Sequence, residues 1–138
     1  MHKLFLHCVG KPKETWINEA VALFLSRMKS YVDFKIHYYK TNEDLEKLNY
    51  PLIALSPDGK MMDSVAFSKY IMKNFENHGL TLHVIIGAAE GLSPALKNKA
   101  ESLISLSPMT FTHEMAKLFF VEQIYRAFEI HFNRGYHK

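Results

Sequence analysis

Residues 82–94 read LHVIIGAAEGLSP and decide the fold. The first five positions are almost all apolar, which is typical of a strand that is covered on both faces of a sheet. Two glycines, Gly87 and Gly91, then interrupt the apolar run, and Ser93 followed by Pro94 favours a helix with proline in its first turn. A buried strand, a short turn and a helix start in this order predict one unit of an α/β fold.

Outward from this stretch, strand-like and helix-like segments alternate five times. Short apolar or alternating runs predict strands, and apolar residues three or four positions apart predict helices. We expect strands at residues 4–9, 34–38, 52–55, 82–86 and 103–106, and helices near 16–28, 41–48 and 64–78, from 94 onward and over 112–132. This alternation predicts a single α/β domain over residues 1–138, with a mostly parallel sheet of five or six strands flanked by helices.

Several local details are also predicted. Thr41 and Asp44 have the spacing of a helix capping pair. The segment Ser56-Pro57-Asp58-Gly59 has the composition of a turn that ends the third strand. On the last helix, we expect the inner side to carry Met115, Leu118, Phe119, Tyr125 and Phe128.

The composition is that of an ordinary globular protein. The 138 residues are 48% hydrophobic and 22% charged, and a chain of this length buries a substantial core. The net charge of +3 permits contact with nucleic acid but does not argue for it. Cys8 is the only cysteine, so it forms no internal disulfide. With no secretory signal and no stretch near the roughly 20 apolar residues of a membrane span, we expect a cytoplasmic protein without a membrane partner.

Ligands of parallel sheets lie beyond the carboxyl ends of the strands, so the loops after Leu55, Ile86 and Leu106 are candidate binding loops. Gly87 allows close approach of a ligand to the backbone, although a plain tight turn has the same sequence. The turn lacks the third glycine of a GxGxxG dinucleotide site. The loop 106–111, LSPMTF, mixes apolar and polar residues in the manner of a small-molecule pocket, or it only seals the core.

The eight histidines form no metal-binding pattern. His113 and Glu114 begin a motif that reads HExxH in zinc proteases, but Lys117 stands where the second histidine is required. His2 and His7 fall on opposite faces of a strand, and no other pair has convincing ligand spacing. We therefore expect no bound metal.

The carboxyl-terminal part of the chain is basic. From charge alone, a solvated helix face with a frayed tail explains these charges better than contact with RNA phosphates does; the residues are Lys117, Arg126, Arg134 and Lys138. The chain ends in Tyr136-His137-Lys138, hereafter the tail. Its ring, imidazole and ammonium have the chemistry to stack on a base, transfer a proton and contact a phosphate, although terminal residues are often disordered.

Four segments carry a family resemblance: IGAAEGLS (86–93), SLSPMTFTHEM (105–115), EQIYRAF (122–128) and GYHK (135–138). Through them the chain resembles the ribosomal large-subunit pseudouridine N3-methyltransferases, a small branch of the knotted SPOUT methyltransferases. Family members commonly have a second glycine where Ala88 stands and an arginine where Lys117 stands. A lysine keeps the positive charge of the arginine but loses its planar, two-pronged donor group.

The resemblance implies a carboxyl-terminal trefoil knot and methyl transfer from S-adenosylmethionine to N3 of a pseudouridine. The substrate would be 23S ribosomal RNA, within the large subunit or the assembled ribosome. A homodimer is also implied, for which the helix 115–132 could supply the interface.

The resemblance also assigns site residues. It implies that S-adenosylmethionine contacts Leu55, Gly87 and the loop residues Leu106, Ser107, Pro108, Met109, Thr110 and Phe111. It places the tail at the active site, where His137 is the first candidate for taking the N3 proton, His113 is the second and Tyr136 lies beside them. RNA contacts are expected from Lys117, Arg126, Arg134 and Lys138.

Two other functions fit the same elements. A non-catalytic α/β module that binds a nucleotide or a ribosomal partner would have this fold, although binding alone would not require both the Gly87 turn and the tail. A flavodoxin-like mononucleotide protein would need a phosphate-binding loop after the first strand. The sequence there, CVGKP at residues 8–12, has one glycine and is a poor candidate.

Overall fold

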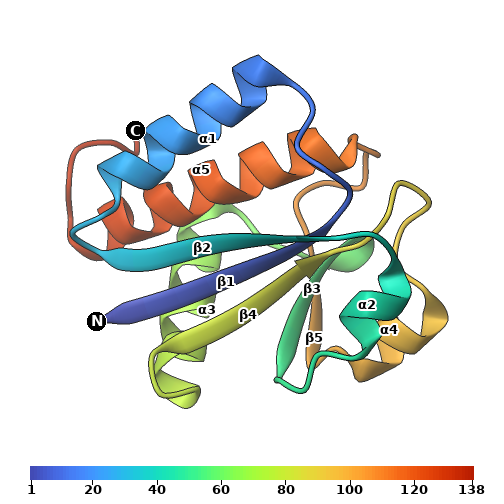
Figure 1. The fold of residues 1–138 in the computed structure, drawn as a ribbon. Coiled ribbons are helices and arrows are strands. Elements are labelled where there is room, and N and C mark those ends of the chain that lie inside the picture. Colours follow the sequence, from blue (N-terminus) through green and yellow to red (C-terminus); the bar gives the residue numbers. More distant parts are fainter.

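The computed structural model describes residues 1–138 and contains five strands and five helices in alternation (Figure 1). The strands are β1 (His2–Val9), β2 (Val32–Tyr39), β3 (Leu52–Met61), β4 (Thr81–Ile86) and β5 (Ser102–Ser105). The helices are α1 (Thr15–Arg27), α2 (Asn42–Glu46), α3 (Ser64–Asn77), α4 (Pro94–Lys99) and α5 (His113–His131). The predicted α/β class and the predicted alternation are confirmed.

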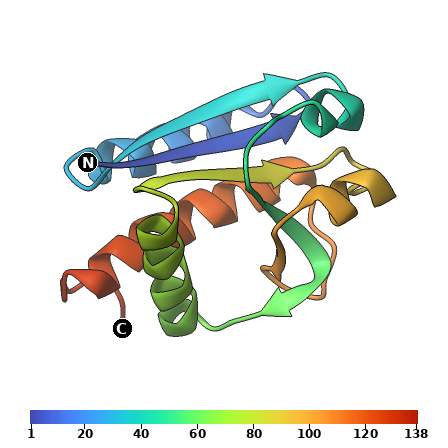
Figure 2. The same ribbon diagram turned by 90° about the horizontal axis from the view of Figure 1, so that it is seen from below.

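The five strands form one sheet in the order β2-β1-β4-β3-β5, and every neighbouring pair is parallel. The central strands β1 and β4 are joined in a register that pairs Leu4 with Leu82 and Leu6 with Val84. α2 and α4 contact each other and lie near the carboxyl ends of β1 and β4, to the right in Figures 1 and 2. The knot concerns how the chain threads, which strand order does not define, so it stays a prediction of the resemblance.

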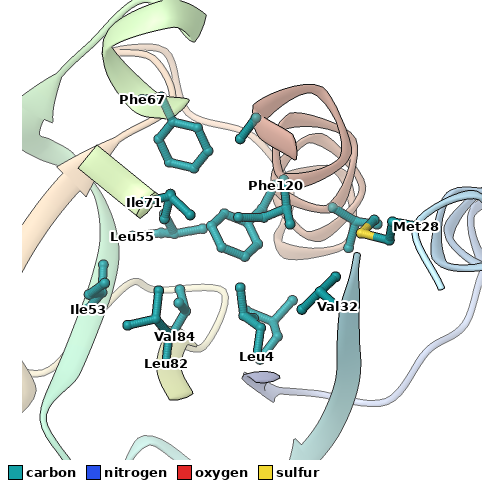
Figure 3. Packing of buried hydrophobic residues seen from close by; sticks show 14 of the residues in the cluster. Leu4, Met28, Val32, Ile53, Leu55, Phe67, Ile71, Leu82, Val84 and Phe120 are labelled. Carbon is teal, nitrogen blue, oxygen red and sulfur yellow. The ribbon is translucent and has the colours of Figure 1, made fainter. Parts of the chain in front are cut away.

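The two faces of the sheet are covered unequally. On one face α5 packs against both α1 and α3, and the three helices enclose a core of 22 buried residues. Figure 3 shows Phe120 of α5 at the centre of this core, among Leu4, Leu55 and Ile71. On the other face α2 and α4 cover only a small cluster, which consists of Val9, Leu45, Leu52, Ala54, Ile85 and Leu96. The rest of that face has no helix over it (Figures 1 and 2).

α2 and α4 begin at the capping residues that the sequence predicts. The capping pair at α2 is confirmed, because Thr41 and Asp44 each bond the backbone N–H of the other. Ser93 caps α4 by accepting a bond from the N–H of Leu96 at 3.2 Å, with Pro94 in the first turn. Such caps satisfy N–H groups that the helix itself leaves unpaired, and each stabilises its helix by about 1 kcal/mol.

The predicted turn at residues 56–59 is wrong. β3 continues through this segment to Met61, and Lys60 and Met61 still pair with β5 after a shift of register. Gly59 makes the bulge possible, because a Cβ atom there would lie 2.7 Å from the backbone of Ile104. The residues that resemble a turn therefore build a β-bulge against β5.

The predicted inner side of α5 is confirmed in part: Phe128 belongs to the core and Met115, Leu118 and Tyr125 pack on it, whereas Phe119 does not. Of the residues expected there only Phe128 is fully buried; Met115, Leu118 and Tyr125 are half-buried and Phe119 is 37% exposed. The buried side carries Phe120, Val121, Ile124, Ala127 and Phe128, together with Glu114, Lys117 and Glu129. Because α5 packs on the sheet and on two neighbouring helices, apolar residues surround it and no single stripe marks its inner side. Neither this helix nor any other is long and apolar enough to cross a membrane.

Candidate active site

A cavity of about 390 Å³ lies at the carboxyl ends of β3, β4 and β5. Its walls come from residues 55–58, 86–92 and 106–111 without Pro108, together with Lys97 of α4 and His113 and Ala116 of α5. The segments 86–92 and 106–111 lie at or beyond the carboxyl ends of β4 and β5, where parallel sheets bind ligands, and 55–58 belongs to the bulged part of β3 beside them. The volume and the mixture of apolar and polar walls are those of a small-molecule site.

Most of the residues predicted to hold a cofactor meet in this cavity. Seven of the eight line it: Leu55, Gly87, Leu106, Ser107, Met109, Thr110 and Phe111. The eighth, Pro108, is exposed and lies outside the lining. Met109 is 73% exposed, so its side chain lies at the mouth rather than in the interior.

The loop from Gly87 to Leu92 is held tightly in place. Ala88 and Gly91 form an isolated bridge, and the N–H of Gly91 donates to the carbonyl of Ala88 at 2.7 Å. The Asn42 side chain of α2 clamps both residues, since it accepts from the N–H of Ala88 at 2.9 Å and donates to the carbonyl of Gly91 at 2.9 Å. A Cβ atom on Gly87 would lie 3.0 Å from the Gly91 carbonyl oxygen, so only glycine permits this fold of the loop without a shift.

The β3 bulge adds a charged pair to the cavity rim. The Lys97 ammonium lies 3.1 Å from the carboxylate of Asp58, and both side chains line the cavity. A hydrogen bond from Ser56 and the contact with Lys97 hold the pKa of Asp58 below its ordinary value, so this carboxylate stays ionised.

Sequence reasoning missed several residues around the cavity, namely Asn42, Ser56, Asp58, Glu90 and Lys97. Asp58 and Glu90 lie in segments 56–59 and 87–92, which the sequence already predicted to be a turn and a candidate binding loop, so a search of those segments for polar side chains would have found them. Asn42 and Lys97 belong to helices and reach the loops only through tertiary packing, which no local signal reveals.

The start of α5 forms one wall and is anchored to the segment after β1. His113 lines the cavity and packs on Gly10, where a Cβ atom would lie 2.9 Å from the imidazole Nε2. This Nε2 is buried and has no hydrogen-bond partner. Next to it, the Glu114 carboxylate accepts from the N–H of Lys13 at 2.7 Å and of Glu14 at 3.4 Å, which keeps the pKa of Glu114 low.

Lys117, which was predicted to contact RNA, is only 2% exposed. Its ammonium donates to the Tyr38 hydroxyl at 3.0 Å and lies 4.9 Å from the centre of that ring. The charge is therefore directed into the protein, between α5 and β2, and this chain does not present it to a phosphate.

Cys8 lies nearby and is buried. Burial raises the pKa of the Cys8 thiol to about 12, so Cys8 is not a reactive thiolate.

The tail is ordered against the carboxyl-terminal half of α5. The Arg126 guanidinium pairs with Glu122 at 2.7 Å and donates to Nδ1 of His137 at 3.1 Å. The Tyr136 hydroxyl donates to Glu122 at 2.6 Å, and its ring lies 4.8 Å below Arg126. Burial and the bond to Glu122 raise the pKa of Tyr136 to about 12. Arg134 and Lys138 remain exposed.

The tail and the cavity lie at opposite ends of the same helix. His113 and Arg126 are thirteen positions apart on α5, which at 1.5 Å per residue is about 20 Å. Figure 1 shows the carboxyl terminus at the left, beside α1, and the ends of β4 and β3 at the right. Of the three predicted catalytic residues, a single chain therefore brings only His113 to the cavity. No group of three or more His, Cys, Asp or Glu side chains is arranged to hold a metal ion.

Comparison with known proteins identifies the family. The family model described as "Predicted SPOUT methyltransferase" matches residues 2–137. A ribosomal RNA large subunit methyltransferase H from Protochlamydia amoebophila (strain UWE25) is 39% identical over 141 residues and covers 100% of both chains. The protein of that name from Coprothermobacter proteolyticus is 36% identical over 138 residues and covers 99% of both chains.

A solved structure supports the fold independently. A probable methyltransferase from Bordetella pertussis Tohama I superposes with a TM-score of 0.56 over 91% of this chain and 96% of that one. The sequence identity between the two chains is only 9%, so this similarity supports the fold and nothing further. With a match to the family model over nearly the whole chain and full-length relatives above 30% identity, this chain belongs to the SPOUT methyltransferase family.

Proposed function

We propose that residues 1–138 form one catalytic domain that transfers a methyl group from S-adenosylmethionine to N3 of a pseudouridine in 23S ribosomal RNA. The observation that carries the proposal is the cavity, which three predicted loops build at the strand ends of a chain that belongs to a methyltransferase family. The names of the full-length relatives support ribosomal RNA of the large subunit as the substrate. Such an enzyme works in the cytoplasm, where large subunits are assembled.

The residues of the cavity suit S-adenosylmethionine. Leu55, Leu106 and Phe111 provide apolar surface for an adenine, and the glycine loop exposes backbone groups for its polar edge. The carboxyl oxygens of Asp58 and Glu90, which both line the cavity, can accept hydrogen bonds from hydroxyl or ammonium groups. When bound, this cofactor supplies an electrophilic methyl group on a sulfonium.

The chain's own part in the reaction is to position the base and to remove the N3 proton. Within one chain His113 is the only histidine that lines the cavity, so it is one candidate base, although its unpartnered Nε2 is buried against Gly10. His137 is the other candidate base. Because an arginine can only donate, Nδ1 of His137 accepts from Arg126 and is occupied until the tail is rearranged. Tyr136, with its high pKa, stays protonated and is suited to stacking on the base.

Positive charges around the tail are proposed to contact the RNA backbone. Arg134 and Lys138 are exposed, and Arg126 holds the tail in shape through His137 and Glu122. Lys117 is proposed to act from within, by fixing β2 against α5 through Tyr38.

A homodimer would complete the site. The cavity and the tail of one chain are about 20 Å apart along α5, and a second copy related by a two-fold axis could place its tail beside the cavity of the first. The exposed side of α5 around Phe119 is the proposed contact surface.

The test is methyl transfer to ribosomal RNA in vitro. Large subunits and whole ribosomes from cells that lack this gene are incubated with the purified protein and S-adenosylmethionine, and the RNA is digested for mass spectrometry. We expect one additional methyl group, on a pseudouridine, and its absence when the protein is omitted. Cofactor binding in calorimetry without any transfer to RNA would instead support a non-catalytic binding module.

A further inference from the structure

The part of the sheet face opposite α5 that lies outside the cluster under α2 and α4 carries a column of stacked rings that the proposed reaction does not use. The residues of this open face are Lys3, Phe5 and His7 of β1, Asp33, Lys35 and His37 of β2, and Thr81 and His83 of β4, with Tyr50 over them. Side chains alternate along a strand, and Leu4 and Leu6 point into the helix-covered core. The open-face residues therefore point to the other side.

The rings are aligned face to face across the strands. Tyr50 lies on His83 with ring centres 3.7 Å apart and planes 4° apart. His83 is followed by His7 at 5.2 Å, and His7 by His37 at 5.7 Å, while Phe5 stacks on His83 at 4.9 Å. The column ends in Tyr50 and His37, which are both exposed. Each end thus offers a ring face on which a further planar group can stack.

Internal hydrogen bonds fix the column and keep its centre neutral. His7 Nε2 lies 3.0 Å from Nδ1 of His83, and His7 Nδ1 lies 2.8 Å from the Tyr39 hydroxyl. Burial, with repulsion from His83 and His37, lowers the pKa of His7 to about 4, so its imidazole is uncharged near neutral pH. The interior of the column is therefore a rigid, uncharged stacking surface.

Charge on the open face suits a polyanion. Lys35 pairs in register with Phe5, and Lys3 lies one row further towards the strand starts. Both lysines are exposed, and Asp33 is the only acid among the strand residues of this face. Flat rings flanked by lysines, with no exposed aliphatic side chain, match the sheet surfaces on which proteins stack unpaired nucleotides.

We infer that the open face binds an unpaired stretch of RNA, with nucleobases stacked on the free faces of Tyr50 and His37 and phosphates beside Lys3 and Lys35. The inference rests on the proposed function, because the RNA would be a part of the ribosomal substrate outside the methylated nucleotide. A paired stretch would not bind in this way, since its bases already stack on one another.

The direct test is binding of a fluorescein-labelled single-stranded oligoribonucleotide of about ten nucleotides, a length typical of one stacking surface. We expect the combined Tyr50→Ala and His37→Ala variant to bind about tenfold or more weakly than the unaltered protein, the usual effect of losing a stacking ring. Tyr50→Phe keeps the ring, and we expect it to bind normally. Lys35→Gln should weaken binding and reduce its salt dependence.

Any of the following binding results would overturn the inference: equal binding by the double alanine variant, an equal loss in Tyr50→Phe, or equal binding of the matching duplex. A changed molecular mass of Tyr50→Ala in light scattering would also overturn it, because it would show that a second copy of the chain covers this face. Calorimetry with S-adenosylmethionine and methylation of ribosomes by the unaltered protein are measured in parallel. If the unaltered protein neither binds S-adenosylmethionine nor methylates ribosomes, the proposed function is contradicted. If the unaltered protein is active and the double variant has a normal KM for ribosomes, only this inference is contradicted.

Discussion

Gly87 shows how the absence of one side chain shapes the cavity. A Cβ atom there would meet Leu92 at 2.9 Å and the Gly91 carbonyl at 3.0 Å. We expect Gly87→Val to push the loop away from Asn42 and to lower the free energy of unfolding by about 1–3 kcal/mol, as overpacking usually does. A displacement of about 1 Å in a positioned site costs about 100-fold in rate, so methyl transfer should fall at least that far.

Calorimetry with S-adenosylmethionine measures the matching loss of affinity. Ala22→Val, on the exposed side of α1, is the control and should bind the cofactor normally. Unchanged cofactor affinity in Gly87→Val would mean that this loop is not part of the cofactor site.

His7 makes the stability of the protein depend on pH. Its folded-state pKa, about 4, lies below the ordinary value of 6.5. Between these values the unfolded chain binds a proton that the folded chain does not, so stability falls as the pH is lowered from 6.5 to 4. His7 therefore lowers the free energy of unfolding by on the order of 3 kcal/mol once the pH has fallen to 4. At neutral pH and above, His7 causes no such decrease, because its imidazole is uncharged in both states.

Urea unfolding at several pH values measures this slope. His7→Gln should flatten it between pH 6.5 and 4. Tyr39→Phe removes a hydrogen bond to His7 but keeps the imidazole, so it should lower stability at every pH and keep the slope. An unchanged slope in His7→Gln would show that other groups cause the acid sensitivity.

At the scale of elements, the tail is bound to α5 by side chains that the rest of the fold does not require. Tyr136 and His137 contact Glu122 and Arg126, and the core residues of α5 lie on another side of the helix. We expect removal of Tyr136 to Lys138 to leave folding and cofactor affinity nearly unchanged. Methylation should fall by about two orders of magnitude, the usual scale for loss of positioning and proton transfer.

Single-turnover methylation of ribosomes checks this prediction, and three point variants separate the contributions. His137→Ala should account for much of the loss if its imidazole takes the N3 proton. Lys138→Ala should mainly weaken RNA binding in a salt-dependent way. Arg126→Lys keeps the charge but loses the two-pronged contact with Glu122 and His137, so it should act as a milder form of the truncation. Full activity of the truncated protein would show that the tail plays no part.

Elements with local signals were predictable from sequence. The caps at Thr41 and Ser93, the buried strand β4 and the three loops at the strand ends needed only neighbouring residues to be recognised. The bulge of β3 was not predictable, because its composition suits a turn and only β5, more than forty residues later, makes it a strand. The inner side of α5 was predicted only in part for the same reason, since which of its residues are fully buried depends on the packing of α1 and α3.

The candidate site divides in the same way. The cofactor-binding loops were predicted from strand topology and from motif resemblance. Both kinds of signal can be recognised within short segments of sequence. The burial of Lys117 beneath Tyr38 joins residues 79 positions apart, so neither charge nor spacing indicated it. By contrast, the predicted helix 112–132 already places His113 at its start and His137 beyond its end, so the sequence did indicate that these two histidines are far apart in one chain.

At the scale of the whole molecule, the distance between cavity and tail leads to the expectation of a dimer. One chain of 16.0 kDa has its tail about 20 Å from its cavity. Light scattering at micromolar concentration should therefore give twice the mass of one chain. A monomer mass with intact activity would contradict both the dimer and a site shared between subunits.

A mixing experiment tests the shared site directly. Gly87→Val damages the cavity, and deletion of residues 136–138 removes the tail, so each variant alone should be nearly inactive. If a two-fold dimer pairs each cavity with its partner's tail, a mixed dimer regains one site with an intact cavity and an intact tail. Random exchange of equal amounts makes half of the dimers mixed, so methylation should return to about a quarter of the unaltered level. Activity that stays at the sum of the two variants, although mass spectrometry shows mixed dimers, would mean that each chain completes its own site by moving its tail.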